Sequence, residues 1–233
     1  GNLYILAKTD DVKITSSNIA EMFEGKKVGC LQLNNFVGYV LRTVLAANEI
    51  KFEVRTDIAE ENTTTDMAYL YNANGQQITP ASDFDLMIAA EPAVNKKISA
   101  ATPLYLAGDL QALYGADGYP QAVLVAKNSI IEENPEFIGD FIAAVDASAE
   151  WIKTAPAQTV YDAILENNGG ATPSFGVTDL TPEVIGRCAV RFEGAQEIKD
   201  RVKTFLSEIS VVAGQTFTVA DAFFYAPRST TAS

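Results

Sequence analysis

The sequence predicts an α/β protein with a mostly parallel sheet and helices on both of its faces. Strand patterns and helix patterns alternate along the chain as far as residue 127, which is typical of parallel strands joined by crossover helices. Two of the strand segments, at 28–33 and 83–90, are short apolar runs. Such runs are expected of strands that are covered on both faces.

The first half of the chain carries most of the strand signals. Apolar runs and alternation between turn residues predict strands at 2–8, 28–33, 51–56, 76–78, 83–90 and 119–127. Helical spacing and capping residues predict helices at 15–23, 37–45, 67–71 and 93–102. Residues 57–66 are expected to form a loop, residues 72–75 a turn, and residues 105–113 fit either a strand or a helix.

The second half is predicted to be helical. Asn134-Pro135-Glu136 combines a capping residue, a proline at the first helical position and an acid in the first turn. The helix that begins there carries an apolar stripe that we expect to face the core, formed by Phe137, Ile138, Phe141, Ile142, Val145, Ala149 and Ile152. Later helices are expected at 156–165, 181–192 and 198–206.

Composition argues against several classes of function. Lys and Arg total 17 against 30 Asp and Glu, a net charge of −13, and an acidic chain repels the phosphates of nucleic acids. The absence of histidine removes the commonest general base and metal ligand, and with them Ser–His and Cys–His catalysis within this chain. We expect no cofactor and no metal site.

The two cysteines, Cys30 and Cys188, match no zinc spacing. We expect buried thiols that act as small apolar side chains, although a disulfide between them stays open. No apolar run approaches the about 20 residues that span a bilayer, and the chain shows no signal peptide at its start. Because it opens on glycine and enters an apolar strand at once, we expect a processed or trimmed chain, with a stand-alone variant as the alternative.

The stretch from Gly25 to Asn48 is the strongest candidate for a binding site. Its apolar strand at 28–33 is followed by Asn34 and Asn35, which can cap the helix that comes next. A strand that enters a helix through such a turn directs backbone N–H groups, and the positive end of the helix dipole, at one place. An ordinary capped strand-to-helix connection without a ligand is the alternative.

Several phrases of the sequence together resemble the nitrate/sulfonate/taurine group of ABC-transporter substrate-binding proteins, which includes thiamine-pyrimidine binders. The resemblance runs from about residue 2 to residue 225, and its phrases come in the order found in that group. They are the segments at 23–29, 85–92, 119–126, 134–138 with Trp151-Ile152, and 223–225. The preceding part of the first lobe has no counterpart in this sequence.

The resemblance implies a periplasmic-binding-protein-like fold of type II, with one complete lobe plus part of a second. The implied divisions are a residual first-lobe strand at 1–12, a second lobe at 13–118, and a crossing strand with C-terminal helices at 119–233. Two such lobes close on a ligand held in the cleft between them. The ligand-binding residues carried over are Gln32, Leu33, Asn34, Asn35, Phe36, Glu91 and Tyr119.

The implied role is to bind a small polar or anionic organic solute, without chemistry, and to deliver it to the membrane subunits of an ABC permease. The asparagine turn would hold a polar or negative group, Glu91 a cationic or N–H-bearing edge, and Tyr119 would stack on a planar ligand. We expect a monomer outside the cytoplasmic membrane, as a lipoprotein or in the periplasm. The alternatives are a dehydratase-like enzyme on the same fold, using Glu91 or Asp85, and a solute-sensing regulatory domain.

Overall fold

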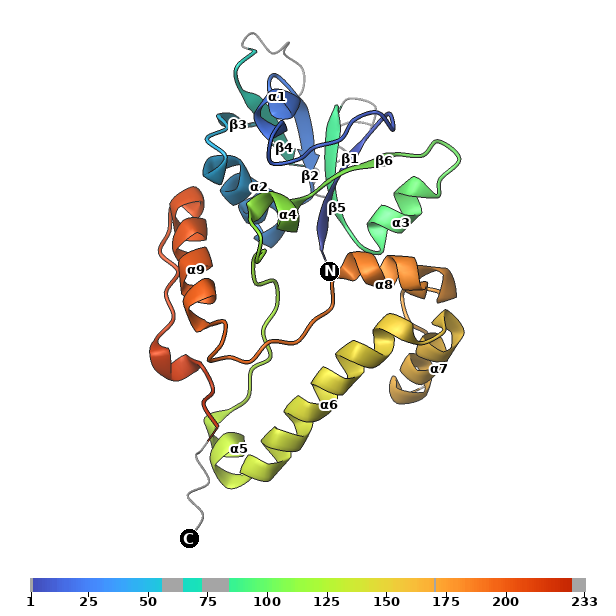
Figure 1. Ribbon diagram of the computed structural model, residues 1–233, viewed down its shortest axis with the longest axis vertical. Helices are drawn as coiled ribbons and strands as arrows, with labels where there is room; N and C mark the ends of the chain where they lie inside the picture. The colour runs from blue at the N-terminus through green and yellow to red at the C-terminus, as the bar shows by residue number, and fades with distance from the viewer. Residues whose placement is uncertain (1, 56–64, 73–83, 170, 228–233) are drawn as a thin grey trace. The chain divides into compact units, whose positions relative to one another are not determined.

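Six strands form one sheet in the computed structural model, which describes residues 2–55, 65–72, 84–169 and 171–227 (Figure 1). In the order of the chain, these strands are β1 Leu3–Ala7, β2 Lys27–Cys30, β3 Phe52–Arg55, β4 Ala68–Asn72, β5 Leu86–Ala90 and β6 Tyr105–Asp109. Their order in the sheet is β3-β4-β2-β5-β1-β6. β2 pairs in parallel with β4 and β5, β3 pairs in parallel with β4, and β6 runs antiparallel to β1. The predicted α/β class with a mostly parallel sheet is confirmed.

The described helices are α1 Ile19–Phe23, α2 Phe36–Ala47, α3 Ala93–Ile98, α4 Leu110–Tyr114, α5 Asn128–Glu133, α6 Pro135–Thr154, α7 Ala157–Asn167, α8 Pro182–Cys188 and α9 Lys199–Ala213, with short 3-10 helices η2 Val177–Leu180 and η3 Asp221–Phe223. Of these helices, α1 to α4 lie between the strands in sequence or directly after β6, and α5 to α9 follow in the second half of the chain. None of the helices in the described part of the chain combines the length and the apolar character needed to cross a membrane.

The chain forms two compact units. Unit 1 contains the chain up to Leu3, Ala89–Leu104 and Gln121–Phe192, and unit 2 contains Tyr4–Ile88, Tyr105–Pro120 and the chain from Glu193 onward. β1 and β5 therefore each begin in one unit and end in the other. The predicted divisions at residues 12 and 118 stay a prediction.

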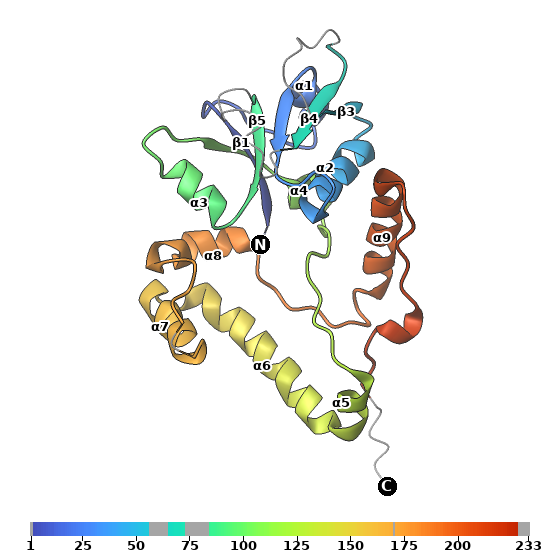
Figure 2. The ribbon, with the colours of Figure 1, turned by 180° about the vertical axis from the view of Figure 1, so that it is seen from behind.

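Unit 2 holds most of the sheet and α2, whose inner face is completely buried. α2 lies against α4 and α9, and Figures 1 and 2 both show α2 and α9 side by side. The buried side chains of α2 recur at helical spacing and include Val40, Leu41, Val44 and Leu45. On α9 the matching face is Val202, Phe205 and Ile209. Full burial of one such side chain contributes about 1.5–3 kcal/mol.

Unit 1 has a smaller core. It centres on Ala155, Val160, Leu180 and Ile185, against which side chains from α6, α7 and the segment before η2 pack. Figure 2 shows α5 at one end of the long α6, with α7 and α8 toward the other. Of the α6 stripe that the sequence predicts to face the core, only Ile138 and Ala149 are buried. Phe137 and Phe141 are 58% and 46% exposed and stack on each other, so the prediction is wrong for that part of the stripe.

Two predicted elements are wrong. The helix expected at 67–71 is strand β4, which is buried from Ala68 to Tyr71. Its aromatic residues favour a sheet, and ladders to β2 and β3 on both edges decide between the two classes. The strand expected at 119–127 has no regular structure. An apolar run favours a strand, but a strand also needs a neighbouring strand for its backbone hydrogen bonds. Among the described residues, no strand pairs with residues 119–127.

Other boundaries differ by a few residues. The helix expected at 15–23 is shortened to α1, the strand at 28–33 stops at Cys30, and the last part of 181–192 lies beyond α8. The ambiguous stretch 105–113 contains both β6 and most of α4. Most of the turn at 72–75, the strand at 76–78 and most of the loop at 57–66 lie outside the described residues.

Candidate functional site

The turn between β2 and α2 connects the carboxyl end of a central strand to the amino end of a buried helix. Asn35 is the N-cap residue of α2, and its Oδ1 accepts a hydrogen bond from the Phe36 N–H at 2.6 Å. The Asn35 N–H donates to the Gln32 carbonyl at 2.9 Å and closes the turn. The prediction of a cap is confirmed for Asn35, whereas Asn34 is exposed and forms no capping bond.

Gln32 takes a left-handed backbone conformation with φ of 60°, which is uncommon for a residue other than glycine. Its Oε1 accepts a hydrogen bond from Nδ2 of Asn35, so side chains as well as backbone hold the turn. The first turn of α2 contains no acidic residue. The positive end of this helix dipole therefore meets no carboxylate of its own helix.

Beneath the turn, Leu33 lies directly on the first turn of α2. A Cβ placed on Gly38 would be 2.2 Å from the Leu33 carbonyl oxygen and 2.3 Å from its Cα, closer than atoms can approach. Only glycine at position 38 allows this contact. The side chain of Leu33, 1% exposed, is buried in the core of unit 2, so Leu33 can offer a ligand only its backbone.

Arg42, one helical turn after Gly38, was missed by sequence reasoning. Its Nη2 donates to the Leu33 carbonyl at 2.6 Å, Nε to the Gly38 carbonyl at 3.3 Å and Nη1 to the Val212 carbonyl of α9 at 3.2 Å. Burial lowers the pKa of Arg42, and the nearby Tyr39 and Cys30 oppose this shift. The sequence did contain a signal for Arg42, because an arginine next to the apolar stripe of a helix is expected to be buried and to need hydrogen-bond partners.

Tyr119 and Phe36 belong to an aromatic cluster in unit 2. Tyr119 is only 2% exposed, and its ring stacks on Phe205 with centroids 5.4 Å apart and planes at 15°. Phe36 meets both rings edge-on at 6.3 Å. The residue expected to stack on a ligand thus stacks on the chain's own Phe205, and its contact with a ligand stays a prediction.

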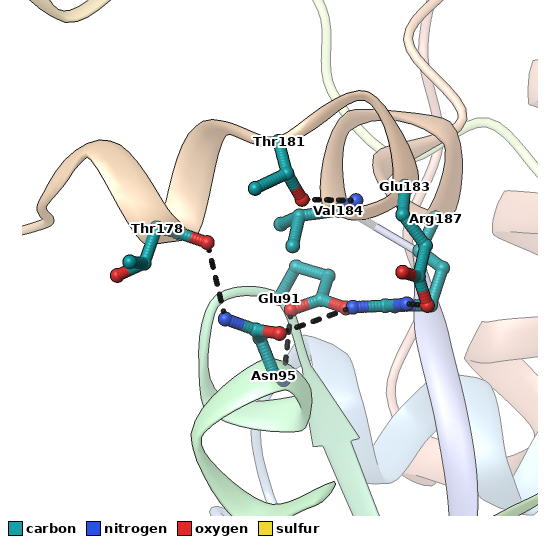
Figure 3. Close-up of polar contacts among 7 residues, drawn as sticks. All are labelled: Glu91, Asn95, Thr178, Thr181, Glu183, Val184 and Arg187. Carbon is teal, nitrogen blue, oxygen red and sulfur yellow. Dashed lines mark hydrogen bonds and ion pairs between the residues drawn. The ribbon is translucent and has the colours of Figure 1, made fainter. Parts of the chain in front are cut away.

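Glu91 belongs to unit 1 and lies in a polar network between α3 and α8 (Figure 3). Its side chain is 1% exposed; Oε1 pairs with Nε of Arg187, and Oε2 accepts the Asn95 N–H at 3.0 Å. Burial alone would lower the pKa of Arg187, but hydrogen bonds and attraction to Glu91 and Glu183 raise it above its ordinary value. The carboxylate expected to meet a ligand is already engaged, and its role in binding stays a prediction.

The same network joins further parts of unit 1. Arg187 Nη1 lies 2.8 Å from the Glu183 carboxylate, and Nδ2 of Asn95 donates to the Thr178 carbonyl at 3.3 Å (Figure 3). Thr181 caps α8 through its hydroxyl, which accepts the Val184 N–H at 3.4 Å. Figure 3 shows Glu91 and Arg187 directed toward each other from separate elements. Sequence reasoning missed Arg187 because its partner Glu91 lies 96 positions earlier.

The described residues contain no group of three acids or cysteines that could hold a metal ion. Asp85, the other acid considered for catalysis, accepts the Lys27 N–H at 2.8 Å and joins the start of β5 to β2. Cys30 and Cys188 are both free thiols, the first buried and the second half-buried. Glu91 and Asp85, the two acids that sequence analysis considered for catalysis, therefore both form contacts that connect separate elements of the fold.

The comparisons with known proteins match the chain to a family model. A family model described as NMT1/THI5 like matches residues 6–159, which are 154 of the 233 residues. The matched region runs from within β1 into α7 and includes the turn, Glu91 and Tyr119. No curated protein and no solved structure matches the chain.

Proposed function

Because the chain belongs to the NMT1/THI5-like family, the group of nitrate-, sulfonate- and taurine-binding substrate-binding proteins, we propose that it is the solute-binding component of an ABC importer. It binds a small polar or anionic organic solute and releases it unchanged. Its partners are the membrane subunits of the permease, and it works as a monomer outside the cytoplasmic membrane, as a lipoprotein or in the periplasm.

The turn before α2 is the observation that carries this proposal. It places the exposed Asn34 and the capping residue Asn35 at the positive end of a helix whose first turn has no acid. Helix amino ends of this kind favour anions through free N–H groups and the helix dipole. Asparagine side chains add both donors and acceptors for a polar solute.

A search for the solute by thermal unfolding tests the proposal. Nitrate, taurine, methanesulfonate and the pyrimidine portion of thiamine are added one at a time to the purified chain. A bound solute raises the free energy of unfolding by RT ln(1 + [L]/Kd), which is about 2.7 kcal/mol at 100 times Kd. If none of these solutes raises the melting temperature, the proposal fails for this group of ligands.

Asn34→Ala and Asn35→Ala then locate the site. Both variants are expected to bind the stabilising solute more weakly, while only Asn35→Ala loses stability, by about 1 kcal/mol, because it removes a helix cap. Asn134→Ala is the matched control, since Asn134 precedes α6 without a side-chain capping bond. Calorimetric affinities equal to that of the unmodified chain in both turn variants would remove the turn from the site.

A further inference from the structure

Arg42 carries a buried positive charge that no carboxylate neutralises among the described residues. Its guanidinium is instead held by three backbone carbonyls and lies over the Tyr39 ring, with Cζ 4.9 Å from the ring centroid. Buried cations are usually paired with anions, because leaving water is costly for a charge. One of the carbonyls, that of Val212, lies at the negative end of α9 and offsets part of this cost.

The three carbonyls come from three different places. Val212 lies in the last turn of α9, Gly38 in the first turn of α2, and Leu33 in the turn that precedes it. The shortest bond, at 2.6 Å, is the one to Leu33. The planar guanidinium has its N–H groups fixed in direction, so one side chain sets the position of the turn relative to two helices of the same unit.

The bond to Leu33 also acts on the next residue. The Leu33 carbonyl and the Asn34 N–H belong to one trans peptide and point in opposite directions. A charged donor on the carbonyl polarises this peptide and makes its N–H a stronger donor. Within the described residues, no acceptor takes the Asn34 N–H, and Asn34 is exposed.

We propose that Arg42 is a positioning residue of the solute site. It holds the Leu33–Asn34 peptide in place and strengthens the Asn34 N–H as a donor to the solute, without touching the solute itself. This inference rests on the proposed function, because it takes the turn as the place where the solute binds.

Two substitutions separate positioning from general stabilisation. Arg42→Met removes every donor and the charge, and is expected to weaken the binding of taurine, the first probe, about tenfold or more. Arg42→Lys keeps the charge and three N–H donors on a single nitrogen, and is expected to restore most of the affinity. Arg201→Met is the matched control, since Arg201 belongs to the same unit and pairs with Glu193 at 2.6 Å. Affinities are measured by calorimetry at a temperature where all variants are folded.

A second measurement needs no solute. In the free protein, the ¹⁵N-resolved amide signal of Asn34 should move upfield in Arg42→Met, and the backbone of 31–36 should lose order by heteronuclear relaxation. In Arg42→Lys the Asn34 signal should stay close to its position in the unmodified chain, and in Arg201→Met it should not move. A role in stability alone would lower the melting temperature and leave this signal in place.

The outcomes separate the two proposals. Failure of the proposed function appears in the unmodified chain, which then binds none of the solutes. The proposed role of Arg42 is tested in the variants. An Asn34 signal that does not move in Arg42→Met overturns this role, whether or not a solute is known. A taurine affinity of Arg42→Met equal to that of the unmodified chain overturns it as well. An equal loss of affinity in Arg201→Met would also overturn it.

Discussion

Cys30 shows how burial of one side chain makes stability depend on pH. Its thiol lies in the central strand β2, and burial raises its pKa from 9.0 to about 12, although nearby Arg42 opposes the shift. The unfolded chain therefore loses this proton near pH 9, whereas the folded chain keeps it to about pH 12. The thiol's contribution to stability is fully present below pH 9 and is lost as pH rises toward 12.

Cys30→Ala tests this linkage. Urea unfolding at pH values from 8 to 11 should give a free energy of unfolding that falls more steeply with pH in the unmodified chain than in the variant. The variant lacks the buried sulfur atom at every pH, so its free energy of unfolding is lower at pH 8 but falls less steeply above pH 9. Curves that fall in parallel would show that Cys30 does not contribute to the alkaline loss.

At the scale of elements, the Glu91–Arg187 pair joins the turn before α3 to α8. The two side chains are 1% and 10% exposed, so loss of one charge leaves the other buried. Glu91→Gln is expected to lower the free energy of unfolding by about 3 kcal/mol. Trp151, the one tryptophan of the sequence, lies in α6 of the same unit, and its fluorescence is a local measure of unfolding.

Glu183→Gln is the matched control for that pair. Glu183 bonds the same guanidinium but is 79% exposed, so its removal should cost less than about 1 kcal/mol. Equal losses in the two variants would contradict the view that burial makes the Glu91 pair important.

The success of sequence reasoning differs between elements for a physical reason. The cap at Asn35, the start of α6 at Pro135 and the buried strands β1, β2 and β5 follow from local chemistry and short periodicity, which the sequence carries directly. β4 could not be told from a short helix, because its identity depends on ladders to strands distant in sequence. The prediction that the apolar stripe of α6 is buried was wrong for a similar reason. Apolar spacing shows which face of a helix is apolar, but not whether another element covers that face.

The candidate site was predictable to a similar degree. The turn and its asparagines follow from the strand-to-helix pattern. The partners of Arg42 do not, because Val212 lies 170 positions away along the chain. The surroundings of Glu91 and Tyr119 were equally hidden, since Arg187 and Phe205 reach them only through the fold.

For the whole molecule, the net charge of −13 acts against the folded state. Folding brings like charges together, and salt weakens their repulsion over distances of about 10 Å at 0.1 M. Salt also weakens exposed ion pairs such as Lys51–Asp66, but these contribute little. We therefore expect stability to rise with ionic strength.

Thermal unfolding between 0.02 and 0.5 M salt tests this expectation. A gain of about 1 kcal/mol would raise the melting temperature by about 2–4 °C in a chain of this size. Sodium chloride and potassium chloride should act alike if screening is the cause. A falling melting temperature would show that ion pairs outweigh repulsion.

The close fit of Leu33 on Gly38 has a consequence for the energetics of recognition. A loop that is flexible before a ligand binds loses conformational entropy on binding, and this loss lowers the affinity. Here the backbone of Leu33 packs tightly against Gly38 of its own helix, and this contact fixes the turn when the polypeptide folds. The turn is thus preorganised, and changes in affinity among its variants should appear mainly in the rate at which the solute dissociates.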